Sequence, residues 1–249
     1  MNKVGWIFLI VALITGCATK AGKEAEEQRK KAAQTQVELG IGYMNKGDMD
    51  VAKSNLDRAL ELDPDLASAH NAIAIYYEHR GENDRAASHY KKAARLNPED
   101  GAALNNYGAF LCKKGRFADA EEYILKAIAL PDYDTPEYAY ENLGICAASV
   151  DKLDKAEQYF RKALEINNRL PMSLLQMANI NFQRRQYMSA RAYLQRFESA
   201  AKHSAESLWL AVQVEQKLNA KDRVGQYSEQ LKAEFPGSEQ AKRLMTPLN

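Results

Sequence analysis

One pattern occurs twice, 34 residues apart, in Leu39–Pro64 (LGIGYMNKGDMDVAKSNLDRALELDP) and Ile73–Pro98 (IAIYYEHRGENDRAASHYKKAARLNP). Each copy has apolar and small residues at helical spacing on both sides of a central glycine, Gly47 or Gly81, that an acidic residue follows. Helical spacing of this kind indicates an amphipathic helix, and a glycine after it is a common helix terminator. Each copy therefore predicts two antiparallel helices joined by a short turn.

A period of 34 residues with small and large residues at these positions is the tetratricopeptide repeat signature. We expect an all-α fold, a right-handed superhelical solenoid of about six such repeats. A helix pair of this type cannot bury its apolar faces without neighbours, so the units must stack, and binding along the stacked surface is the expected function. The repeats lie near residues 33–66, 67–100, 101–134, 137–170, 171–204 and 205–238.

The register slips by two residues between the third and fourth repeats. The extra length falls in Leu130–Pro136 (LPDYDTP), where two prolines forbid a continuous helix and favour an extended connection. Within the repeats, Gly47, Gly81 and Gly115 occupy the turn between the two helices. We expect them to adopt the left-handed backbone conformation that ends the first helix, because glycine adopts it without steric cost.

Composition excludes several classes of function. Lys and Arg number 34 against 33 Asp and Glu, so no strong field favours nucleic acid or an anionic surface. The sequence contains no phosphate-binding loop, nucleophile elbow or metalloprotease motif. Of the four histidines, His70 occupies a core position, and His79, His89 and His203 have no second ligand at metal spacing. We therefore predict a binding protein and not an enzyme, with no cofactor, no metal and no nucleic acid partner.

The first residues have the character of a secretory signal. Lys3 precedes an uncharged run, Val4–Ile14 (VGWIFLIVALI), that is far shorter than the roughly 20 residues needed to cross a bilayer. The run leads into Ile14–Cys17 (ITGC), which resembles a bacterial lipoprotein box. That resemblance implies cleavage of residues 1–16 and lipidation of Cys17. The alternatives are a plain secretory signal with a chance cysteine and an uncleaved anchor helix.

The residue after the cysteine is Ala18, and the resemblance to Gram-negative lipoproteins then implies sorting to the outer membrane, facing the periplasm. Residues 17–32 contain no large apolar side chain, so we expect a lipidated N-terminus followed by a flexible tether, helical near its end. Residues 239–249 form a C-terminal tail, which we expect to begin as helix.

Two further cysteines, Cys112 and Cys146, lie in the first helices of adjacent repeats, at their twelfth and tenth positions. Neighbouring first helices pack side by side in this architecture, so a disulfide is geometrically plausible in an oxidising compartment. The two-position offset suggests that the distorted junction is needed to bring the pair together. The alternative is two buried free thiols that act as small apolar core residues.

The inner face of the array is lined by recurring first-helix positions, and it is the candidate partner-binding groove. An apolar surface edged by amides suits an extended peptide, because Asn can donate to and accept from a peptide backbone. Apolar residues at helical spacing can also be core, so core packing of Val37 and Ile41 remains an alternative. Repeat five contributes Leu175 and Asn179 to the same face. The predicted groove residues are Val37, Ile41, Met44, Asn45, Asn71, Ile75 and Asn105.

Two segments are more selective than the repeat pattern, Leu104–Cys112 (LNNYGAFLC) and Glu141–Cys146 (ENLGIC), with Tyr133 and Pro136 in the connection between them. Together they resemble the PilF/PilW lipoproteins of type IV pilus biogenesis, and the resemblance runs from the lipoprotein box through Phe235–Ser238 (FPGS). It implies a monomeric outer-membrane scaffold that binds the pilus secretin, and other pilus proteins, and promotes secretin localisation, secretin multimerisation and pilus stability. The alternative is a lipid-anchored adaptor for outer-membrane assembly machinery or for cell-wall enzymes.

Overall fold

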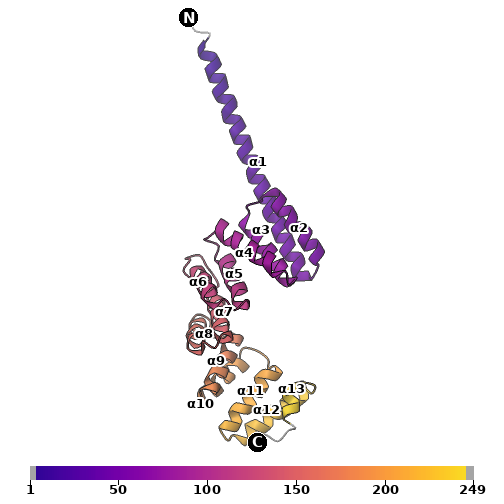
Figure 1. The fold of residues 1–249 in the computed structure, drawn as a ribbon, viewed down its shortest axis with the longest axis vertical. Coiled ribbons are helices and arrows are strands. Elements are labelled where there is room, and N and C mark those ends of the chain that lie inside the picture. The colour runs from indigo at the N-terminus through magenta and orange to yellow at the C-terminus, as the bar shows by residue number, and fades with distance from the viewer. Residues whose placement is uncertain (1–3, 245–249) are drawn as a thin grey trace. The chain divides into compact units, whose positions relative to one another are not determined.

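The computed structural model describes the backbone of residues 4–244 and the side chains of residues 22–244. This part of the chain forms thirteen α-helices and no strand, which confirms the all-α tetratricopeptide architecture (Figure 1). The helices divide into two units, one ending at Phe110 and the other beginning at Leu111, and the division falls within α5. The side chains of the predicted signal segment 1–16 and of Cys17, and residues 245–249 of the predicted tail, lie outside the described residues.

Unit 1 contains two complete helix pairs and most of α5. In each pair the first helix packs against the second, and α1 also packs against α3, the first helix of the next repeat. Its elements are α1 (Val4–Lys46), α2 (Met49–Leu62), α3 (Ala67–His79), α4 (Asn83–Leu96) and α5 (Gly101–Lys113), the last of which ends in unit 2.

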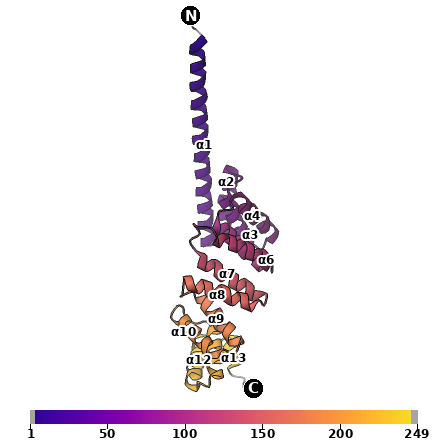
Figure 2. The ribbon, with the colours of Figure 1, turned by 90° about the vertical axis from the view of Figure 1, so that its left-hand side faces the viewer.

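Helix α1 is continuous over 43 residues and extends well beyond its partner α2 in both views (Figures 1 and 2). Residues 17–32, expected to be a tether that is helical near its end, are therefore helical throughout. Ala, Lys, Glu and Gln are good helix formers, and ion pairs between Glu26 and Lys30 and between Glu27 and Lys31 stabilise the exposed helix at a spacing of four residues. Among the residues searched, no helix is long and apolar enough to span a bilayer.

Unit 2 continues the same arrangement through three further first helices, α7, α9 and α11. Each packs against its own second helix, α7 also packs against α9, and α9 packs against α11. The elements of unit 2 are α6 (Phe117–Ile128), α7 (Pro136–Ser149), α8 (Leu153–Ile166), α9 (Pro171–Gln183), α10 (Tyr187–Glu198), α11 (Ala205–Lys217), α12 (Lys221–Glu234) and α13 (Glu239–Arg243).

The turns inside the repeats share one left-handed residue and one hydrogen bond. In the second repeat, the Glu82 N–H donates to the Tyr77 carbonyl across Gly81, whose φ is 72°, and the same bond recurs in every repeat. The left-handed residues are Gly47, Gly81, Gly115, Asp151, Arg185 and Asn219. Their spacing is 34 residues except between Gly115 and Asp151, where it is 36. The slip therefore lies where the proline-flanked connection predicts it.

Small residues in the first helices allow close approach of the second helices. A Cβ atom on Gly40 would lie 2.7 Å from Leu56 Cγ, and a Cβ on Gly144 would lie 2.5 Å from Phe160 Cε1. Both distances are too short for real carbon atoms, and Leu56 and Phe160 are fully buried. The interior is packed at crystal-like density, so these side chains have little room to move away. Glycine at these positions is thus required for the observed helix packing.

Arg185 has an unfavourable backbone conformation, because its φ is 60° and its side chain is a large exposed group rather than a glycine hydrogen. The left-handed conformation costs about 1–2 kcal/mol for a residue with a Cβ, and substitution by glycine would remove this strain from the folded chain. Glycine also has a higher conformational entropy in the unfolded chain, which offsets part of the gain in stability. We expect Arg185→Gly to raise the free energy of unfolding by about 0.5–1 kcal/mol, measured by urea denaturation. The opposite change at the equivalent turn, Gly115→Ala, should lower it. A destabilised Arg185→Gly protein would contradict this account of the turn.

Candidate partner-binding surface

The predicted groove residues of unit 1 lie on α1, α3 and α5. Ile41 and Asn45 on α1 are exposed, whereas Met44 on the same helix is half-buried. On the two following first helices Asn71, Ile75 and Asn105 are half-buried. The helices are joined at this face, since Ser68 Oγ donates to Gln34 Oε1 over 2.8 Å and Asn106 Nδ2 donates to Asn71 Oδ1 over 3.4 Å. The exposed part of the surface is thus an isoleucine edged by amides.

Val37 does not belong to this surface, which corrects the sequence prediction. Its side chain is 1% exposed and packs in the core of unit 1 with Leu56, Ala72 and Ile73. The next residue of the stripe, Ile41, is 40% exposed. Valine is short enough to fit between the helices, so the candidate surface of repeat one begins at Ile41 and not at Val37.

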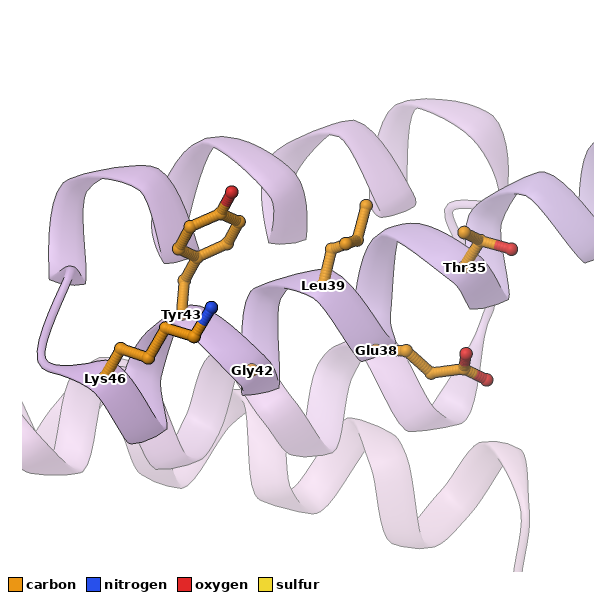
Figure 3. A pocket seen from close by; sticks show the side chains of 6 residues that line it. All are labelled: Thr35, Glu38, Leu39, Gly42, Tyr43 and Lys46. Carbon is orange, nitrogen blue, oxygen red and sulfur yellow. The ribbon is translucent and has the colours of Figure 1, made fainter.

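The opposite face of α1 carries a hollow of about 270 Å³ that the sequence did not predict. Figure 3 shows Leu39 and Tyr43 along it, between Glu38 and Lys46. Leu39 is 44% exposed, although Ile73, its equivalent in the next repeat, is 1% exposed. In unit 1 the difference has a simple cause, because α1 and α2 pack against Ile73 but no described helix pair precedes Leu39. The residues that line the hollow are Thr35, Glu38, Leu39, Gly42, Tyr43 and Lys46.

Unit 2 has an inner face of its own that sequence reasoning described only in part. The sequence pattern predicts Leu175 and Asn179 on this face. The structure adds Tyr138 and Met172, which are exposed, and Trp209, which is half-buried. The signal that would have found them is the repeat spacing itself, because Met172 follows Tyr138 by 34 residues and Trp209 follows Leu175 by 34.

A histidine pair lies in unit 1, with His70 buried on α3 and His89 half-buried on α4. His70 Nε2 lies 3.0 Å from the Pro64 carbonyl oxygen, and His70 Nδ1 lies 2.8 Å from His89 Nδ1. A carbonyl can only accept, so neutral His70 carries its proton on Nε2, and His89 Nδ1–H donates to His70 Nδ1. The pair can accept one extra proton, on His89 Nε2. A second extra proton would have to bind His70 Nδ1, where its N–H would point at the N–H of His89 Nδ1. Structural packing explains both residues.

Burial lowers the pKa of His89 to about 4, with further contributions from His70 and from the nearby Lys92. The pKa of His70 is also lowered, chiefly by burial and against a raising effect of its hydrogen bond to Pro64. Both groups are therefore neutral at pH 7 in the folded chain. Within the residues searched, no group of three or more His, Cys, Asp and Glu side chains could hold a metal ion.

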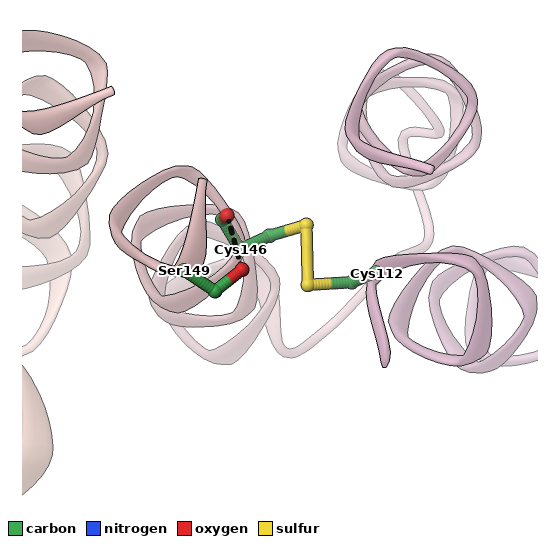
Figure 4. Close-up of a disulfide and its surroundings, with 3 residues drawn as sticks. All are labelled: Cys112, Cys146 and Ser149. Carbon is green, nitrogen blue, oxygen red and sulfur yellow. Dashed lines mark hydrogen bonds between the residues drawn. A yellow bond between two sulfur atoms is a disulfide. The ribbon is translucent and has the colours of Figure 1, made fainter. Parts of the chain in front are cut away.

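Cys112 near the end of α5 and Cys146 in α7 form a disulfide, with a Cα–Cα distance of 5.4 Å (Figure 4). Beside it, Ser149 Oγ donates to the Cys146 carbonyl over 2.8 Å. Both cysteines belong to unit 2, so the bond ties the end of α5 to the first helix of the following repeat.

The offset between the two cysteines does not depend on the distorted junction, contrary to the sequence expectation. Glu141 and Ser173 also face each other at repeat positions that differ by two, and their repeats are regularly spaced: Ser173 Oγ donates to Glu141 Oε2 over 2.6 Å. A residue of one first helix can therefore meet the residue two positions earlier in the next repeat without any irregularity in the spacing.

The histidine pair predicts a pH-dependent stability. Between pH 6.5 and 4 the unfolded chain binds a proton at position 89 that the folded chain does not, so stability is fully present above pH 6.5 and is lost as the pH falls towards 4. We expect a loss of about 1 kcal/mol between pH 7.5 and 5 from this group, after discounting for solvent screening. Urea titrations of His89→Phe should lack this component, whereas those of the exposed control His79→Phe should keep it. Equal pH slopes in the two variants would rule out the pair as the cause.

The disulfide predicts a redox-dependent stability. Closing a loop of about 35 residues stabilises a fold by roughly 3–4 kcal/mol in the chain-entropy model. Dithiothreitol should therefore lower the urea midpoint of protein made in an oxidising compartment, and should not affect the Cys112→Ser/Cys146→Ser double variant. Mass spectrometry after alkylation should find both cysteines blocked in the native protein. Two alkylated thiols would mean that the bond does not form.

Family models and individual relatives identify the same family for this chain. The tetratricopeptide repeat family matches residues 37–100 and 99–169. Over 235 residues the chain is 32% identical to the type IV pilus assembly protein PilF of Pseudomonas aeruginosa, covering 93% of each chain. It is also 31% identical over 157 residues to an uncharacterised protein of Haemophilus influenzae, covering 63% of this chain and 87% of the relative.

Solved structures agree with the sequence relatives. The structure of Pseudomonas aeruginosa PilF superposes with a TM-score of 0.81 at 32% identity, covering 88% of this chain and 98% of that one. The structure of PilW, described as a widely conserved type IV pilus biogenesis factor, superposes with a TM-score of 0.79 at 29% identity, covering 86% and 98%. Nearly the whole length of both relatives is matched, so the shared repeats are not a local coincidence. The chain belongs to the PilF/PilW family of tetratricopeptide repeat proteins.

Proposed function

We propose that this chain is a lipid-anchored scaffold for type IV pilus biogenesis, held at the outer membrane and facing the periplasm. In this role it binds subunits of the pilus secretin and promotes their localisation and multimerisation, and thereby pilus stability. One observation carries the proposal, the similarity to PilF over 93% of both chains. The repeat fold supports it as well, because tetratricopeptide arrays present extended surfaces to protein partners.

The surface proposed to bind the secretin is the inner face of unit 1, with Ile41 at its centre. Ile41 is exposed, the amide of Asn45 lies one turn away on the same helix, and Ile75 lies on α3, the neighbouring first helix. An apolar side chain of an extended partner segment can pack on the two isoleucines, and the amide can bond to its backbone. The described side chains therefore fit a peptide ligand better than a small polar one.

Lipidation at Cys17 would convert this binding into delivery. A protein with several acyl chains stays on one membrane face, because each buried methylene contributes about 0.8 kcal/mol. A secretin subunit bound to such a scaffold is held at the membrane at a high effective concentration, which favours multimerisation there. Location and binding together account for the proposed role without catalysis.

The binding surface can be tested by matched substitutions. We expect Ile41→Glu to reduce secretin capture by the purified chain at least about tenfold, because it places an unpaired charge against apolar side chains of the partner. Val51→Glu is the control, since Val51 is 44% exposed against 40% for Ile41 but lies on α2. Capture is measured by co-purification from the envelope, and circular dichroism checks the fold. Undiminished capture by Ile41→Glu would exclude this surface.

The same experiment in cells separates binding from anchoring. Cells that produce only Cys17→Ser protein should lack label from a radioactive fatty acid, contain secretin monomers and carry few surface pili, although this protein still binds secretin after purification. Normal multimers and normal piliation in cells without the chain would refute the pilus assignment. Recovery of outer-membrane assembly proteins or cell-wall enzymes in place of secretin would favour the adaptor function.

A further inference from the structure

The inner face of unit 2 carries large apolar side chains at regularly recurring positions. Three sets of positions, each spaced by 34 residues, lie on the first helices α7, α9 and α11. In a monomeric protein an exposed contiguous apolar patch commonly marks an interaction site. The three sets are Tyr138, Met172 and Glu206; Glu141, Leu175 and Trp209; and Ile145, Asn179 and Gln213.

These side chains form one surface because their helices are adjacent. Helix α7 packs against α9 and α9 against α11, in the order in which they follow one another in unit 2 (Figures 1 and 2). The Ser173 N–H donates to Glu141 Oε2 over 2.9 Å, which fixes the first two helices at the level of Tyr138 and Met172. At the other end, Gln240 Nε2 donates to Glu206 Oε1 over 3.4 Å. The surface thus extends from α7 to α13.

Its C-terminal part is hollowed. A depression of about 250 Å³ lies between α9, α11 and α13, with Leu175 and Trp209 as its apolar walls. Four amide side chains surround them, and each can both donate and accept a hydrogen bond. This combination suits a peptide in extended conformation, whose backbone groups need partners and whose alternate side chains point to one face. The lining residues are Leu175, Gln176, Asn179, Glu206, Trp209, Leu210, Gln213 and Gln240.

The charge of the surface indicates the charge of its ligand. The nine positions include two carboxylates, Glu141 and Glu206, and no Lys or Arg. The pKa of Glu206 is lowered by the hydrogen bond from its own backbone N–H and by Ser204, so it is ionised at neutral pH. An acidic segment would be repelled and would find no cation, whereas a Lys or Arg of the ligand can pair with Glu206.

We propose that the inner face of unit 2 binds an extended segment of a partner protein that has apolar side chains at alternate positions and a Lys or Arg. Tyr138, Met172, Leu175 and Trp209 provide the apolar contacts, and Glu206 provides the charge. This surface is separate from that of Ile41 in unit 1, so the proposal goes beyond secretin binding and does not depend on it.

The chain has a built-in reporter for this test. It contains two tryptophans, Trp6 and Trp209. Trp6 lies in the segment 1–16 that is expected to be cleaved, and Trp6→Phe removes it from any uncleaved chain, so the variant purified in detergent retains only the tryptophan of the hollow. A phage library of random nonapeptides is selected on this protein. We expect enrichment of peptides with alternating apolar residues and a Lys or Arg, and depletion of Asp and Glu. A synthetic copy of an enriched peptide should shift the Trp209 emission to shorter wavelength in a saturable manner.

Matched variants assign the site. Met172→Ser should weaken peptide binding about tenfold, whereas Met188→Ser should not, although Met188 is 63% exposed against 45% for Met172. Glu206→Gln should weaken binding severalfold and reduce its dependence on salt, and the exposed control Glu229→Gln should not. Circular dichroism verifies that each variant is folded.

Several outcomes would overturn the proposal. These are the absence of any enriched peptide, enrichment of acidic peptides, and binding that Ile41→Glu abolishes but Met172→Ser leaves unchanged. A shift of Trp209 emission with protein concentration alone, together with a dimer in analytical ultracentrifugation, would show that a second copy of the chain occupies this face.

Discussion

The close approach of helices at small residues is the constraint on which the other features of this chain depend. Gly40 and Gly144 leave no space for a Cβ beside Leu56 and Phe160, so the two helices of these repeats approach each other closely. Such a pair has apolar surface left over on its outer side, and only the next pair can cover it. Leu39 illustrates the rule, because it is exposed at the start of the array while its equivalent Ile73 is buried.

Because the outer surfaces are used for stacking, the inner faces of the first helices are the surfaces that we propose for partner binding. On those faces the sequence is free to vary without loss of the fold, which is why function has to be inferred from individual residues and not from the architecture. The two units use this freedom differently. Unit 1 presents a small apolar surface edged by amides around Ile41, whereas unit 2 presents aromatic and thioether side chains, Tyr138, Met172 and Trp209, next to Glu206.

The sequence predicted the fold well because its signal is periodic. The turn glycines Gly47, Gly81 and Gly115 take the left-handed conformation as expected. Arg185 takes it too, without any local signal, since the hydrogen bond across the turn is required by stacking and overrides the preference of the residue. Burial is harder to predict than helical periodicity: the pattern assigned Val37 to the inner face, but its packing against Ile73 and Leu56 places it in the core.

The helical structure of residues 17–32 changes what the N-terminal segment does. A flexible segment would let unit 1 sample many heights above a membrane, whereas a helix rises about 1.5 Å per residue and keeps its ends apart. If Cys17 carries the lipid, Gln34, the residue of α1 that is hydrogen-bonded to Ser68 of α3, lies about 25 Å along the helix from the anchor. The inner face around Ile41 would then be held at a defined distance from the membrane. If this helix acts as a spacer, it would narrow the set of positions from which one bound partner subunit can meet the next, and would raise their effective concentration more than a flexible tether of the same length.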